Sequence, residues 1–139
     1  MEPAGVGGCG GVLPEPDRRQ PLTVSGSFPE RARAAERTAF DGTVTITNDT
    51  DRRIEGLAAS QPDVYLTRDA RIVATPVPRD DVGLLLDLAP RAGRSFDTMG
   101  SLRRCADDQP LPPGLYEIHA VLRFDGKEAV GGPWQLEVA

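Results

Sequence analysis

The amino-acid sequence predicts an all-β fold, an antiparallel β-sandwich of about seven to nine strands. Apolar and polar residues alternate in short runs, which is the pattern of strands with one buried face. Gly, Pro, Asn or Asp separates these runs at near-regular intervals. Helical periodicity is almost absent, and 139 residues are enough for one domain with a hydrophobic core. Many short strands without helices are typical of a two-layer β fold.

The first twenty residues differ from the rest of the chain. They are rich in Gly and Pro and have no periodicity, which predicts a flexible arm at 1–20 ahead of a single domain at 21–139. The domain opens with "LTVSGSF" at 22–28, whose apolar residues share one face of a strand. Residues 30–37 are polar on nearly all sides, so we expect a loop there that crosses between two sheets.

The next strand is expected in "FDGTVTITN" at 40–48. Phe40, Val44 and Ile46 point to one face of this strand, and threonines alternate with them. The Asn and Asp residues that follow satisfy backbone groups locally and predict a turn. Further short strands, each bounded by Pro, Gly or Asp, are expected at 53–60, 63–67, 71–77, 82–88 and 93–102.

The C-terminal residues predict a hairpin. Apolar residues at alternate positions from Tyr116 to Phe124 share one face of a strand at 115–124. "DGKEAVGG" at 125–132 predicts the loop, and 134–138 predicts the last strand. The residues expected in the core are Phe40, Val44, Ile46, Tyr116, Ile118, Leu122, Phe124, Trp134 and Leu136.

The only histidine, His119, falls on the opposite face of the same strand, with Glu117 and Arg123. We interpret it as a partly exposed residue of a sheet surface. Nucleophilic catalysis needs a nucleophile, a base and an orienting group in contact, and no serine lies in a nucleophile-elbow context. A Cys105–His119 dyad is possible only if Cys105 is free. We therefore predict no catalytic residues and no enzyme.

Charge and hydropathy exclude several further classes. A net charge of −5 argues against a nucleic-acid partner, which requires a clustered positive field. No apolar run approaches the roughly 20 residues of a transmembrane helix, and the N-terminal residues lack the features of a signal peptide. Two cysteines and one histidine do not supply a zinc site. No cofactor or metal is predicted, although Ca²⁺ remains an alternative in the acidic loops, which contain Asn48, Asp49 and Asp51, Asp80 and Asp81, and Asp107 and Asp108.

The two cysteines, Cys9 and Cys105, predict one disulfide and therefore an oxidising compartment. We expect an extracytoplasmic protein, secreted or associated with the cell envelope, whose signal sequence is absent from these residues. Two alternatives remain open. The cysteines could be unrelated free thiols, or "VGGC" at 6–9 could be the end of a bacterial lipobox, with a lipid anchor on Cys9 in the natural precursor.

"PPGLYEI" at 112–118 resembles the entry to the penultimate strand of immunoglobulin-like domains. The resemblance implies a structural corner at Gly114 and Tyr116, in which the tyrosine hydroxyl bonds to a nearby backbone carbonyl. Ile118 stands where antibody domains have cysteine, a departure that favours the disulfide-free bacterial sandwiches. Over 40–138, "TITND" and "LPPGLY" are similar to the BsuPI-like intracellular proteinase inhibitor domain. The N-terminal Cys-Gly and the late "GGPW" resemble small exported actinobacterial proteins.

These observations favour a non-catalytic extracytoplasmic module that binds an unknown protein partner through loops or an open sheet edge. The alternative is a proteinase inhibitor of the BsuPI-like type, and a small hydrolase is third. The candidate interaction loop, "PVPRDDV" at 76–82, is stiffened by its two prolines. Its residues are Pro76, Pro78, Arg79, Asp80 and Asp81.

Overall fold

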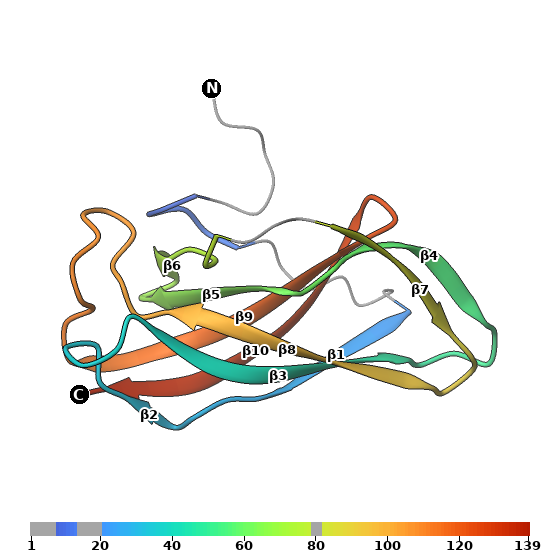
Figure 1. The fold of residues 1–139 in the computed structure, drawn as a ribbon, viewed down its shortest axis with the longest axis horizontal. Helices are drawn as coiled ribbons and strands as arrows, with labels where there is room; N and C mark the ends of the chain where they lie inside the picture. The colour runs from blue at the N-terminus through green and yellow to red at the C-terminus, as the bar shows by residue number, and fades with distance from the viewer. Residues whose placement is uncertain (1–7, 14–20, 79–81) are drawn as a thin grey trace.

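The computed structural model of the protein describes residues 8–13, 21–78 and 82–139, and Figure 1 shows the fold. Over these ranges the chain forms ten strands and no helix. The strands make two sheets that pack face to face around a common core. The protein is thus an immunoglobulin-like antiparallel β-sandwich, which confirms the fold class predicted from the alternating pattern.

The first sheet has three strands in the order β1-β3-β8. They are β1 (Leu22–Ser27), β3 (Ala39–Asn48) and β8 (Gly93–Ser101), and both pairings are antiparallel. In the central strand, Val44 and Ile46 point inward between the sheets.

The second sheet is larger and branched. Its strands are β2 (Arg31–Ala32), β4 (Ile54–Ala59), β5 (Asp63–Arg68), β6 (Arg71–Ala74), β7 (Gly83–Leu88), β9 (Gly114–Phe124) and β10 (Lys127–Val138). β9 pairs with β10 along one edge, and with both β5 and β4 along the other. β6 extends the sheet beyond β5, and β7 extends it beyond β4. This side of the sheet therefore ends in two separate outer strands, β6 and β7.

The chain changes sheets between β1 and β2. β1 belongs to the first sheet, whereas Arg31 and Ala32 pair in parallel with the end of β10 in the second. Residues 30–37 therefore cross between the sheets as expected, but they also contain a short strand that the sequence does not predict. This strand has only two residues, which are too few for side-chain alternation to reveal it.

The C-terminal hairpin is longer than the sequence predicts. The expected loop at 125–132 is wrong, because only Asp125 and Gly126 form the turn and β10 already begins at Lys127. Both turn residues have positive φ, 51° and 77°, the geometry of the tight two-residue turn that an Asp-Gly pair favours. The two long strands stay in register except for a bulge between Gly131 and Trp134.

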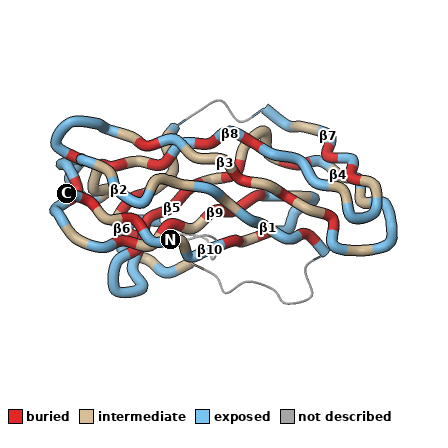
Figure 2. The backbone as a smooth tube through the Cα atoms, turned by 90° about the horizontal axis from the view of Figure 1, so that it is seen from below, coloured by how far each residue is buried: buried red, intermediate tan, exposed pale blue. Residues whose placement is uncertain are grey.

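The core lies between the two sheets, and Figure 2 shows its buried positions alternating with exposed ones along the strands. Phe124 and Trp134 are only half-buried, so the expectation that they are core residues is wrong. The expected core residues that are buried are Phe40, Val44, Ile46, Tyr116, Ile118, Leu122 and Leu136.

Trp134 is half-buried because it lies at the seam where β10 approaches β1. Its ring packs against Phe28, with ring centroids 5.2 Å apart. Glycines on both strands make room for the indole, since a Cβ at Gly26 would lie 3.1 Å from its Cη2 and one at Gly132 would lie 3.2 Å from its Cε3. Phe124 is half-buried for a different reason, because it ends β9 next to the hairpin turn.

Tyr116 is buried at the start of β9, and its hydroxyl donates a hydrogen bond of 2.6 Å to the carbonyl of Pro112. The guanidinium of Arg68, on β5, lies 5.3 Å from the centre of the tyrosine ring. Gly114 is the first residue of β9. The hydrogen bond fastens the loop before β9 to that strand, and the cation–π contact joins β9 to β5.

Candidate binding surface

Large apolar side chains are exposed on the outer face of the second sheet where β4 meets β7. Leu57 and Leu85 are directly opposite each other on the two strands, and they are 64% and 62% exposed. We call Leu57 and Leu85 the apolar patch. Exposed apolar residues that neighbour one another often mark an interaction site.

The local sequence explains why these leucines face outward. β7 has three consecutive leucines, of which Leu84 and Leu86 point toward the core and Leu85 points away from it. On β4, Leu57 alternates with Ala58, which is buried in the core. The register of the pair then places the two outward leucines together.

An ion pair lies at one end of the patch. Arg53 Nε donates a hydrogen bond of 2.7 Å to Asp87 Oδ1. The hydrogen bond and the charge of this carboxylate hold the pKa of the Arg53 guanidinium above its usual value. Asp87 is the only charged residue of β7, and the charge of Arg53 balances it.

The outer edge of β7 differs from the other edges of the sandwich. On β6, Ile72 exchanges two N–H···O bonds of 2.8 Å with Gly10 and Gly11. β10 is covered by β2 and lies beside β1. β8 lies beside β5, and the hydroxyl of Thr98 donates to the carbonyl of Pro62. Beyond β4, β7 has no backbone hydrogen-bond partner within the described ranges, and neither has β8 beyond β3, but β7 is the one with exposed leucines beside its edge.

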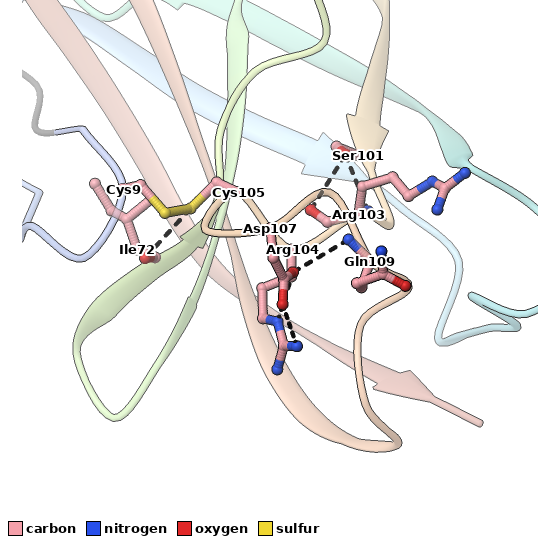
Figure 3. The surroundings of a disulfide bond; sticks show 8 residues. All are labelled: Cys9, Ile72, Ser101, Arg103, Arg104, Cys105, Asp107 and Gln109. Carbon is pink, nitrogen blue, oxygen red and sulfur yellow. Dashed lines mark hydrogen bonds and ion pairs between the residues drawn. A yellow bond between two sulfur atoms is a disulfide. The ribbon is translucent and has the colours of Figure 1, made fainter.

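The predicted disulfide is present, and Figure 3 shows its surroundings. Cys9 and Cys105 are bonded with their Cα atoms 5.7 Å apart, and no described cysteine is free. A bonded Cys9 sulfur cannot also carry a thioether-linked lipid, and a bonded Cys105 cannot act in a dyad with His119. The structure is therefore that of the disulfide-bonded form of the protein.

Cys105 is presented by a compact loop at 102–111. Leu111 N donates to Leu102 O, and Arg104 N donates to Gln109 O at 2.7 Å. Arg104 Nε also donates to a carboxylate oxygen of Asp107 at 2.9 Å (Figure 3). This hydrogen bond is the main reason that the pKa of Asp107 is lowered. The loop holds Cys105 against β6 through these internal bonds.

Cys9 belongs to a segment, residues 8–13, that lies over the outer face of the second sheet. Leu13 packs with Val130 against Tyr65, Ile72 and Val121, three buried residues on that face. We call Tyr65, Ile72, Val121 and Val130 the outer cluster. Residues 8–13 thus cover both the edge of β6 and a small apolar surface that lies outside the main core.

His119 is close to this region, opposite Tyr65 in the pairing of β9 with β5. It is half-buried on the outward face, as expected, and its Nε2 is 3.0 Å from Thr67 Oγ1. Burial lowers the pKa of His119, and the charge of Glu117 opposes this effect. The partner of His119 is itself buried, because Thr67 is only 3% exposed.

The structure describes only part of the candidate interaction loop at 76–82. Pro76 and Pro78 lie on the connection between β6 and β7, whereas Arg79, Asp80 and Asp81 lie outside the described residues.

The acidic loops contain pairings of their own. Asp49 Oδ1 accepts a hydrogen bond of 3.1 Å from Arg91, and Asn48 is buried and donates to the carbonyls of Arg52 and Leu88. In the described ranges no group of three or more His, Cys, Asp or Glu side chains is arranged to hold a metal ion.

Sequence reasoning missed the apolar patch. "GLLLDL" predicts a strand, but three consecutive leucines do not reveal which of them points outward. The signal was in β4, where Leu57 occupies the same face as the charged Glu55. In a strand, a leucine on the face that also carries charged residues is expected to be exposed.

No protein-family model matches the chain, and no curated protein matches it either. Among solved structures, a crystal structure of the CARDB domain of a Pyrococcus furiosus protein, in complex with di-metal ions, has a TM-score of 0.48 at 12% identity and covers 100% of both chains. A solution structure of the same domain has a TM-score of 0.48 at 13% identity, covering 86% of this chain and 94% of that one. A β-glucosidase from Listeria innocua has a TM-score of 0.46 at 16% identity over 84% of this chain. The chain spans only 16% of that enzyme's length.

A search of the described residues for a helix long and apolar enough to cross a membrane finds none.

Proposed function

We propose that the protein is a non-catalytic binding module that captures an extended segment of a partner protein along the outer edge of β7. The observation that carries this proposal is the contrast between edges. The chain covers β6 with its own residues and places β2 on β10, whereas β7, like β8, has no further backbone partner in the described ranges, and β7 has the exposed Leu57 and Leu85 beside its edge. Natural proteins usually protect such an edge, so an accessible one with exposed leucines beside it favours use as a binding site.

The addition of a strand from a partner protein uses both the outer edge of β7 and the exposed leucines beside it. Backbone N–H and C=O groups of β7 supply hydrogen bonds to an added strand, and side chains beside the edge supply selectivity. Leu57 and Leu85 form an apolar surface next to that edge. A matching segment alternates apolar residues, contains no proline within its paired stretch, and carries little charge next to the Arg53–Asp87 pair.

The disulfide supports an extracytoplasmic location for this module. Disulfides persist in oxidising compartments and are rare in the cytosol. The Cys9–Cys105 bond joins residues that are 96 positions apart, so it closes most of the chain into one loop. A module that works at the cell envelope or outside it is consistent with that bond.

The test is selection of peptides from a displayed library of random 12-residue sequences on the disulfide-bonded protein. We expect recovered peptides to alternate apolar residues, and to bind at least tenfold more weakly to the variant Leu85→Lys. Leu115→Lys is the matched control, because Leu115 is 63% exposed but lies on β9, away from β7. Equal loss in both variants, or peptides that bind Leu85→Lys as well as they bind the unmodified protein, would contradict the proposal.

The inhibitor alternative uses the connection at 76–82, which leads into β7. A panel of proteases incubated with micromolar protein separates the two functions. Inhibition that survives in Leu85→Lys but is lost when Pro76 and Pro78 are replaced by Ala favours the inhibitor. Absence of inhibition throughout the panel leaves the binding module.

A further inference from the structure

Residues 8–13 make few contacts of their own with the sandwich. Gly10 and Gly11 bond to Ile72 through backbone groups only, and Arg71 Nη1 donates to Gly10 O at 3.3 Å. Val12 is 56% exposed, which leaves Leu13 as the apolar side chain that packs on the outer cluster. Glycines lose more conformational freedom on ordering than other residues, so this segment is costly to hold in place. Its position therefore depends strongly on the disulfide.

The other end of the disulfide is held independently. Cys105 N donates to Val73 O at 2.8 Å, and the loop at 102–111 has its own internal hydrogen bonds. Leu102 and Leu111, at the two ends of that loop, are buried in the core. Breaking the disulfide thus frees the Cys9 side and leaves the Cys105 side in place.

We propose that the β6 edge and the outer cluster form a second strand-binding site, which residues 8–13 cover while the Cys9–Cys105 bond is intact and uncover when it is reduced. The reductant is a dithiol. Its two thiols supply two electrons and become a disulfide, the Cys9–Cys105 bond breaks, and each cysteine sulfur takes up one proton. Cys9 is an exposed residue, so this exchange takes place at the surface of the protein. The site lies on a different edge from β7 and stands independently of the function proposed for that edge.

The resident segment shows what the opened site accepts. Ile72 offers one N–H and one C=O, which now bond to Gly11 and Gly10. Beside them the outer cluster accepts a side chain of the size of Leu13. The chemistry fits an extended segment with small residues opposite Ile72 and a leucine-sized residue next to them.

The test is amide hydrogen exchange of the full chain before and after treatment with dithiothreitol. The reporter is the Ile72 amide, which donates to residues 8–13, and the control is the Val44 amide in the central strand of the first sheet. We expect exchange at Ile72 to become at least tenfold faster on reduction, while Val44 stays protected and reoxidation restores the original rate. The double variant Cys9→Ser, Cys105→Ser should show fast Ile72 exchange without reductant and no response to it.

Two results would overturn the proposal. Unchanged protection at Ile72 after complete reduction means that residues 8–13 stay in place without the disulfide. Loss of protection at Val44 together with Ile72 means that the disulfide holds the whole domain rather than this segment. The double variant separates these outcomes from incomplete reduction, since it has no disulfide to reduce.

Discussion

Removing the disulfide by replacing Cys9 and Cys105 with Ser should lower the free energy of unfolding by a predictable amount. The bond joins residues 96 positions apart, and a loop of that size lowers the entropy of the unfolded chain enough to stabilise the protein by about 4–5 kcal/mol. This figure is an upper value here. When residues 8–13 leave β6, the folded variant regains conformational freedom that the bonded protein lacks. We therefore expect a loss of roughly 2–4 kcal/mol, which is the usual range for a disulfide.

The assay is urea unfolding followed by the fluorescence of Trp134, which is the only tryptophan and lies at the seam between the sheets. With a urea dependence of about 1–3 kcal/mol per molar for a small domain, a loss of roughly 2–4 kcal/mol should lower the urea midpoint by about 0.7–4 M. The reduced natural protein should match the double variant, because both lack the bond. A decrease of less than about 0.5 M in the urea midpoint would refute the loop-entropy reasoning. A full 4–5 kcal/mol loss would contradict the release of residues 8–13.

Two further changes test the packing and the electrostatics. Gly100→Ala should destabilise by about 1–3 kcal/mol, because the new Cβ would lie 2.5 Å from Cε1 of the buried Phe40. Urea midpoints check this, with Gly8→Ala as the control, since nothing lies within 4 Å of a Cβ there. His119→Gln should make stability less dependent on pH just below 6.5. Because burial lowers the pKa of His119 in the folded protein, stability is complete above the ordinary histidine pKa of about 6.5 and is lost as the pH falls toward the depressed value. Thermal unfolding of both proteins between pH 5.5 and 7.5 measures the difference, and parallel curves would contradict it.

The fold is predictable from the sequence where one face of a strand is buried and the other is wet. β9 illustrates this, because its alternation from Tyr116 to Leu122 matches the buried positions. Prediction fails where a strand is too short to show alternation, as in the two-residue β2, or where residues with weak strand preference continue a long hairpin. The polar and Gly-rich stretch after Asp125 suggests a loop, yet pairing with β9 holds it as a strand up to the bulge.

The candidate sites also differ in how far the sequence predicts them. The disulfide was predictable because the chain has only two cysteines, Cys9 and Cys105, and the pairing has no competitor. The covering of β6 by residues 8–13 was not predictable, because two glycines bond there through their backbones and leave no pattern in the sequence. The apolar patch depends on the register that places Leu57 opposite Leu85, and register between distant strands is a property of the whole sheet.

The disulfide also determines how the molecule carries mechanical tension. When the two ends of the chain are pulled apart, force passes from Cys9 directly to Cys105, and residues 10–104 lie inside a covalently closed loop. Beyond Cys9, only the segment after Cys105 can then be drawn out, about 120 Å at roughly 3.5 Å per residue. The same pull on the reduced chain can extend nearly all of it, about 450 Å beyond Cys9. β1 and β3 to β8 are therefore shielded from tension at the ends, and the load falls on the β9–β10 hairpin.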